Sequence, residues 1–283
     1  MYHEVEETYH DFLEDIKILR ENHIMIKGHE RASGKNFIKI GQKFKQHLEQ
    51  LQIIHLAFQQ YPDQLKKETI ENLAETLIYE RIGTYLRRQL VNLYQYEETK
   101  LAHKCRELSA MVSDQIMVFN RIFGCNLLPN MKPNKSLKIF KLFLTKSQLP
   151  YEMVYVLCKC QKMAIEELAE FYNRDRSQID ADTMMPYLLF IVIRGIMEVN
   201  FEHFNKKRNG LLLQGSEAAE EVPSADQMYL SEPYQPDHLM DSAFISRMLM
   251  VEFFTIKELS FDETQYAFVT FKNVEEMLDR YGK

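Results

Sequence analysis

Apolar residues recur every three or four positions through the first half of the chain, the spacing that places them along one face of an α-helix. This spacing predicts helices over residues 5–19, 37–58, 70–96 and 101–123. Gly28 to Gly34 are expected to separate the first two helices, and Gly124 and Pro129 to end the last, because glycine and proline interrupt helices. Amphipathic helices in this order indicate an antiparallel bundle over residues 1–130.

The second half of the chain carries the same helical spacing after Pro133. The pattern covers residues 137–144, 150–172, 182–204, 239–254 and 270–281. Pro150 suits a first helical turn, where its missing N–H group costs nothing. Residues 205–238 are polar and contain several prolines, so they are expected to form a mobile insertion. The prediction is an all-α fold in which the bundle packs on a second helical domain, residues 134–281, because the linker at 129–136 is short.

Composition agrees with a folded helical protein. Of 283 residues 46% are hydrophobic, enough to fill a buried core, and the scarcity of Gly (9) and Pro (8) favours helices over sheets. The net charge of −6, with a pI near 5.9, gives no overall attraction to nucleic acid or to anionic lipid. Nucleic acid is therefore not an expected partner.

The sequence predicts a cytoplasmic protein. Its start, MYHEVEETYHDF, is acidic and aromatic, and it lacks the basic and apolar regions of a secretory signal. The apolar run from Met184 to Ile193 contains Pro186 and is shorter than the roughly 20 residues of a membrane span, so it predicts a buried helix. Four cysteines are too few for the disulfide framework of a secreted fold, and reduced thiols are expected.

Motifs of the common catalytic classes are missing from the sequence. It has no GxxxxGK[ST], GxGxxG, GxSxG or HExxH motif. Cys158 and Cys160 are two residues apart, so in a helix they point to different faces and are expected to be core cysteines. The cluster Lys206 to Arg208 is interpreted as solvated charge. The sequence therefore predicts no metal, no cofactor and no covalent catalysis.

The segment IDADTMMPYLLFIVIRG is unusual because two acidic residues, Asp180 and Asp182, directly precede a nearly all-apolar helix. An aspartate at such a position is typical of a helix N-cap, whose side chain accepts a hydrogen bond from an exposed backbone amide. Taken alone, this segment favours a capping role. The sequence on either side of it adds a second interpretation.

Residues 181–193 resemble the signature of the vacuolar protein sorting 9 exchange domain, an Ala-Asp-Asp run followed by two apolar residues, a proline and an apolar helix. Upstream, LPYEMVYVLCKCQKMAIEEL resembles the Pro-led helix of that family, and TQYAFVTFKNVEEMLDRY resembles its closing segment. Together these segments span residues 134–281, and the N-terminal helices resemble the bundle that precedes this domain in several members. The resemblance implies a guanine-nucleotide exchange factor for an early-endosomal Rab GTPase, recruited from the cytoplasm to endosomes through its partners.

The resemblance also implies which residues contact the GTPase. Asp182 takes the place of the acidic finger that enters the nucleotide site, and Tyr266 that of a tyrosine that holds the switch region. The remaining GTPase-binding positions are Met185, Pro186, Leu189, Val269 and Thr270. The chain departs from the family at Thr183, which replaces a second acidic residue, and at Val269, where a threonine is usual although Thr270 is adjacent.

Three other interpretations stay open at this point. Asp180, two residues from Asp182 and likewise acidic, competes for the finger role. A helical adaptor that binds a Rab GTPase without exchanging its nucleotide fits the same resemblance, whereas an unrelated helical bundle used as a scaffold would bind no GTPase. A hydrolase or transferase would need clustered titratable groups, which the sequence does not offer.

Overall fold

The computed structural model describes residues 2–22, 25–114, 116–123, 133–213, 243–255 and 263–281. These residues are 88% helical and contain no strand, which confirms the all-α fold class. The result follows from a chain that is poor in glycine and proline and that repeats its apolar positions with the helical period almost throughout.

Short connections join most of the helices. Their bounds are α1 (Tyr2–Asn22), α2 (Glu30–Gln50), α3 (Gln52–Ala57), α4 (Asp63–Leu93), α5 (Gln95–Asp114), α6 (Ile116–Phe123), α7 (Lys135–Thr145), α8 (Pro150–Tyr172), the short helix η1 (Arg176–Gln178), α9 (Ala181–Leu213), α12 (Phe244–Phe254) and α13 (Glu263–Arg280). The predicted helices at 137–144 and 150–172 are confirmed. Pro150 is the first residue of α8, and Asn173 ends it in the left-handed conformation, with φ of 50°.

Several predicted helix boundaries are wrong, among them the starts of α4 and α5, which begin at Asp63 and Gln95 rather than at residues 70 and 101. Gly34 lies inside α2, so the break after α1 includes only the first of the two expected glycines, Gly28, whose φ is +85°. The predicted second helix is divided into α2 and α3 at Leu51, which has an extended backbone. The last helix, α13, begins at Glu263 rather than at Thr270.

The expected insertion at 205–238 is helical in its first part. Helix α9 continues to Leu213, because residues 205–213 contain no proline to end it. The rest of that segment lies outside the described residues, as do residues 239–242 of the next predicted helix.

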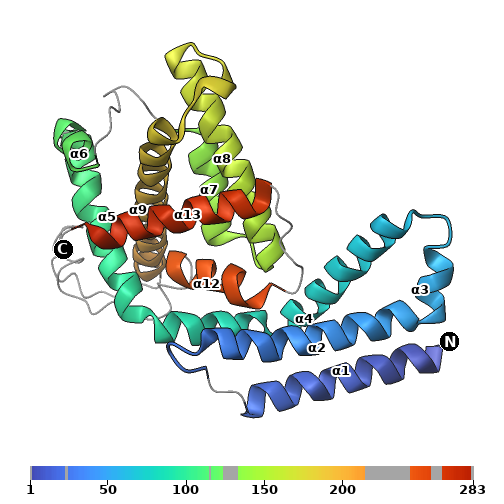
Figure 1. Cartoon of the computed structure of the whole chain (residues 1–283). Coiled ribbons are helices and arrows are strands. Elements are labelled where there is room, and N and C mark those ends of the chain that lie inside the picture. Colours follow the sequence, from blue (N-terminus) through green and yellow to red (C-terminus); the bar gives the residue numbers. More distant parts are fainter. Residues whose placement is uncertain are drawn as a thin grey trace.

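Helix α12 lies at the centre of the fold, where it packs against α2, α4, α5 and α8. Figure 1 shows α13 crossing α8 and α9, with α1 and α2 forming an outer layer on the other side of α12. Phe37 of α2 shows how closely the halves meet, since its ring centroid lies 5.8 Å from that of Phe254 in α12 and 5.4 Å from that of Tyr79 in α4. Buried residues from both halves of the chain therefore form one hydrophobic cluster.

Buried glutamates from one helix cap the start of another. Glu98 of α5 accepts hydrogen bonds from the backbone N–H groups of Phe244 and Ser246, at 3.1 and 2.7 Å, in the first turn of α12. Glu75 of α4 accepts one from the N–H of Tyr151, at 3.2 Å, in the first turn of α8. The first turn of a helix has unpaired N–H groups and a partial positive charge, so each carboxylate stabilises the helix start that it contacts.

Helix α9 is the apolar centre of the C-terminal half. By length and hydropathy its segment Ala181–Glu202 resembles a membrane span, but 67% of the most apolar window is buried inside the protein. Leu188, Ile191 and Ile193 are among its fully buried residues. The predicted buried helix at 184–193 is confirmed.

Candidate functional site

Asp180 is the N-cap of α9. Its Oδ1 atom accepts a hydrogen bond from the backbone N–H of Thr183 at 2.8 Å, and its carbonyl oxygen accepts one from Met184 at 3.0 Å. The hydrogen bonds from Thr183 hold the pKa of Asp180 below its usual value. The capping interpretation is therefore correct for Asp180, whose carboxylate is engaged within its own helix.

Asp182 lies in the first turn of the same helix, and its side chain is exposed. Its carboxylate makes no hydrogen bond or ion pair with any part of the chain that the structure describes. Pro186, four residues later, has no N–H group to donate to the carbonyl of Asp182, which therefore lacks its usual helical partner. Both aspartates are exposed, but Asp182 is the one whose carboxylate has no partner among the described residues.

The expected GTPase-binding residues of α9 differ in their exposure. Met185 is half-buried, whereas Pro186 is buried and Leu189 has no exposed surface. The side chain of Met184 points inward, and its sulfur accepts a hydrogen bond from Nε2 of Gln161 in α8 at 3.4 Å. Between Ala181 and Ile193 the exposed and half-buried side chains of α9 thus lie in its N-terminal part, before Pro186, and Leu189 lies in the core.

The start of α13 contacts α8 at Lys162, the residue after Gln161. Lys162 donates a hydrogen bond to Glu263 of α13 and forms an ion pair with it. Both side chains are exposed, so the ion pair contributes little to stability. It does show that the first turn of α13 lies against α8 at Lys162. Adjacent residues of α8 therefore contact the start of α9 and the start of α13, so the two helix starts pack against the same turn of α8.

Helix α13 exposes an apolar strip beside this contact. Tyr266 is 58% exposed and Val269 is 47% exposed, whereas Thr270 is only 4% exposed. The hydroxyl of Thr270 donates to the carbonyl oxygen of Tyr266 at 2.8 Å, inside the helix. Tyr266 and Val269 are thus available to a partner, whereas Thr270 lies on the buried face of α13.

Sequence reasoning missed one member of this surface, Tyr155 of α8, which is 63% exposed. It lies seven residues before Lys162, two helical turns along the same face of α8. The apolar spacing of α8 gave no signal for it, because a tyrosine fits the buried face as well as the exposed one. Tyr155 therefore adds an exposed aromatic side chain on the face of α8 that carries Lys162.

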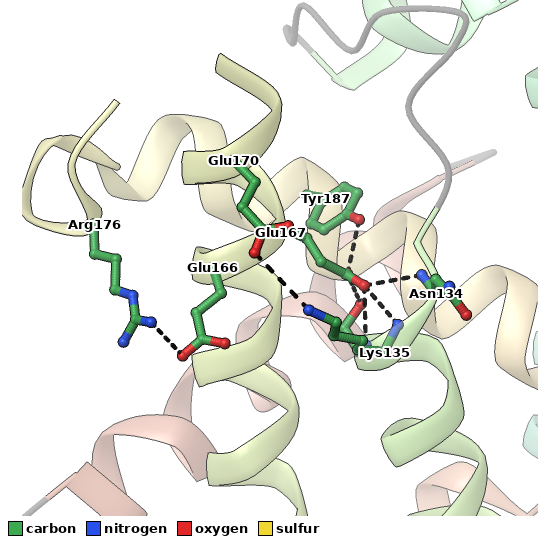
Figure 2. Close-up of polar contacts among 8 residues, drawn as sticks. Asn134, Lys135, Glu166, Glu167, Glu170, Arg176 and Tyr187 are labelled. Atoms are coloured by element: carbon green, nitrogen blue, oxygen red, sulfur yellow. Dashed lines mark hydrogen bonds and ion pairs between the residues drawn. The ribbon is translucent and has the colours of Figure 1, made fainter. Parts of the chain in front are cut away.

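A second feature that the sequence did not predict is a hydrogen-bond network around Glu167 of α8, drawn in Figure 2. One carboxylate oxygen accepts hydrogen bonds from the backbone N–H groups of Asn134 and Lys135, at 3.0 and 2.6 Å, at the start of α7. The other oxygen accepts one from the hydroxyl of Tyr187 in α9 at 3.0 Å, and one from the hydroxyl of Ser136. A single carboxylate therefore holds α7, α8 and α9 together at Tyr187, the residue after Pro186.

Burial and the charge of Glu167 raise the pKa of Tyr187 well above its usual value, so its hydroxyl stays a hydrogen-bond donor. On the outer side of α8, Arg176 of η1 forms an ion pair with Glu166 at 2.9 Å (Figure 2). These contacts fix the turn that leads into α9, and with it the position of Asp182.

Metal ligands and reactive thiols are the remaining candidates for chemistry among the titratable groups of the described residues. No group of three or more His, Cys, Asp or Glu residues that could hold a metal ion occurs in the described ranges. Cys158 and Cys160 form no disulfide and are buried, which confirms their predicted place in the core, and burial raises the pKa of the Cys160 thiol. The accessible parts are one carboxylate and a neighbouring apolar strip.

No protein-family model matches the chain, and no curated protein matches it either. The function has to be inferred from the residues and their geometry.

Proposed function

We propose that the protein is a guanine-nucleotide exchange factor for an early-endosomal Rab GTPase and that Asp182 is its acidic finger. The observation that carries the proposal is the exposed, unengaged carboxylate of Asp182 at the start of α9, together with the exposed apolar side chains of Tyr266 and Val269 on α13, which packs against α9 and α8. This pairing of one acid with exposed apolar side chains is what the resemblance to the vacuolar protein sorting 9 domain implies. In this proposal residues 134–281 form the exchange domain.

The physical mechanism follows from how a GTPase holds its nucleotide. The phosphates are bound by the lysine of the phosphate loop and by Mg²⁺, both positively charged. The carboxylate of Asp182 pairs with that lysine and disfavours the metal ion, so the phosphates lose two of their main contacts. The apolar strip meanwhile holds the switch loop of the GTPase in a displaced position.

Exchange then follows from linkage. A partner that binds the nucleotide-free GTPase more tightly than the nucleotide-bound form must weaken nucleotide binding by the same factor. GDP leaves, and GTP later displaces the exchange factor. No covalent bond is made or broken, so the protein needs no catalytic metal or cofactor of its own.

The N-terminal helices support this site in the proposal. Glu98 of α5 caps α12, and α12 packs against α8, which carries Tyr155 and Lys162. We therefore assign residues 1–130 a supporting role as a helical bundle. The protein acts in the cytoplasm and reaches endosomes through its partners.

The test is release of a fluorescent GDP analogue from a panel of purified Rab GTPases, with Asp182→Asn and Asp180→Asn as a matched pair of variants. Both remove one negative charge, but Asn at position 180 still caps α9 because asparagine is as good an N-cap as aspartate. We expect acceleration by the wild type and by Asp180→Asn, and a loss of about tenfold or more for Asp182→Asn, the effect of one charge-assisted hydrogen bond. Equal activity of all three proteins contradicts the finger role.

A second function, an adaptor that binds a Rab GTPase without exchange, is favoured by two residues. Thr183 and Val269 replace the second acidic residue and the threonine that the family pattern has at these positions. Its signature in the same assay is tight binding of one Rab, measured by calorimetry, with no change in GDP release. An unrelated scaffold would bind none of the panel.

A further inference from the structure

A groove with a basic rim is lined by residues of α1 and α4. Figure 1 shows α1 in the outer layer of the fold. Its volume is about 530 Å³. The apolar part of its lining is formed by Leu13 and Ile16 of α1. The rim carries Lys17 and Arg20 of α1 and Arg81 of α4. Helix α1 packs mainly against α2 and α4, so this groove is separate from the surface of α8, α9 and α13.

Two arginines of the rim are held by tyrosine rings and not by carboxylates. The Cζ atom of Arg20 lies 5.8 Å from the ring centroid of Tyr85, and that of Arg81 lies 5.8 Å from the ring centroid of Tyr9. Arg81 also donates a hydrogen bond to the hydroxyl of Tyr9. Neither guanidinium forms an ion pair with a carboxylate in the parts of the chain that the structure describes. Stacking fixes each planar group and leaves N–H donors at its edges for a ligand.

The charge of the groove is opposite to that of the whole protein. Its rim has three cationic side chains and one acidic one, Glu21, whereas the chain has a net charge of −6. Lys17 is in part neutralised by Glu14, whose carboxylate lies 3.7 Å away on the same helix. The positive charge of the groove therefore rests on Arg20 and Arg81, which come from different helices and can grip one ligand from two sides.

We propose that this groove binds a small ligand with several phosphate groups. Guanidinium groups match phosphate oxygens in pairs, and a volume of about 530 Å³ is that of a site for a small molecule rather than for a peptide segment. Soluble inositol phosphates and the headgroups of phosphoinositide lipids share this chemistry. The site is independent of the proposed exchange activity, because none of its residues belongs to the surface around Asp182.

The primary test is calorimetric titration of the full chain with inositol trisphosphate. The variant Arg20→Gln/Arg81→Gln removes both guanidinium groups, and Arg176→Gln/Arg280→Gln removes the same charge at exposed positions elsewhere. All four residues are exposed, so the variants should fold, as circular dichroism would verify. We expect the groove variant to lose at least about tenfold in affinity and the control variant to keep it. No binding by the wild type, or an equal loss in the two variants, would overturn the proposal.

Sedimentation with phosphatidylcholine vesicles that contain phosphatidylinositol bisphosphate identifies the source of the headgroup. Binding of both vesicles and inositol trisphosphate, each lost in the groove variant, assigns the site to a lipid headgroup. Binding of inositol trisphosphate without vesicles assigns it to the soluble ligand. Vesicle binding that survives Arg20→Gln/Arg81→Gln, without binding of the soluble probe, contradicts the groove as the site.

Discussion

Gly34 of α2 faces the backbone of α12 at a distance that leaves no room for a side chain. A Cβ atom built on Gly34 would lie 2.0 Å from the carbonyl oxygen of Phe253 and 2.9 Å from its carbonyl carbon. Ordinary van der Waals contact of a Cβ atom begins at 3.4 Å. Alanine at this position therefore requires α2 and α12 to separate by more than about 1 Å, at the helix that lies in the centre of the core.

Two effects of Gly34→Ala oppose each other. In a helix interior alanine is more favourable than glycine by about 1 kcal/mol. Overpacking a close contact costs about 1–3 kcal/mol and occasionally more. The neighbouring atoms here belong to backbone and not to a flexible side chain, so the cost lies at the upper end. We expect the free energy of unfolding to fall by about 2 kcal/mol, against the direction that helix propensity alone predicts.

Urea unfolding followed by far-ultraviolet circular dichroism measures this change, and an unaltered m-value would show that the extent of unfolding is the same. Asn36→Ala is the control, since this residue is exposed on the same helix and gains helix propensity without a new contact. A Gly34→Ala protein as stable as the wild type, or more stable, would refute the close approach of α2 and α12.

Three further substitutions test the packing and capping contacts. Gly195→Ala should lower the urea midpoint, because its Cβ atom would lie 2.4 Å from Cδ1 of the buried Phe140 ring, and an unchanged midpoint would contradict this contact. Glu167→Ala should cost about 2 kcal/mol in urea unfolding because it leaves several donors unpaired, whereas Glu170→Ala at an exposed neighbouring position should change stability by less than about 0.5 kcal/mol. Burial raises the pKa of Glu98 from 4.5 to about 7, so the folded protein binds a proton that the unfolded chain has released, and the free energy of unfolding should fall as pH rises between these values. Glu98→Gln should flatten this slope in urea titrations at several pH values, and equal slopes in the two proteins would exclude Glu98 as its source.

Much of the fold could be predicted from the sequence because helices carry local signals. Pro150 suits only a first helical turn, and it does begin α8. The spacing of apolar residues at 137–144 and 182–193 placed α7 and the buried part of α9 correctly. In these segments the backbone preference, the apolar period and the tertiary packing all favour the same structure.

Other features depend on contacts between distant parts of the chain, and no local pattern shows them. Gly34 has a sequence context typical of a helix break, but its lack of a side chain serves the contact between α2 and Phe253. Glu98 and Glu167 have the sequence appearance of surface residues, yet they cap helices that begin 146 and 32 residues away along the chain. The sequence likewise placed Asp180 and Asp182 together as N-cap candidates, and only the hydrogen bond to Thr183 separates their roles.

The burial of α9 restricts how a partner can approach the candidate site. From Pro186 to Ile193 every residue of α9 is buried, so a partner cannot lie along this part of the helix. Before Pro186, the N-terminal turn of α9 is accessible and carries the exposed Asp182. Helix α13 packs against both α8 and α9 and exposes Tyr266 and Val269, while α8 exposes Tyr155. In the proposed exchange complex a charged group of the GTPase therefore meets Asp182 while an apolar segment lies across α13 and α8, which is the division of contacts that the proposed mechanism requires.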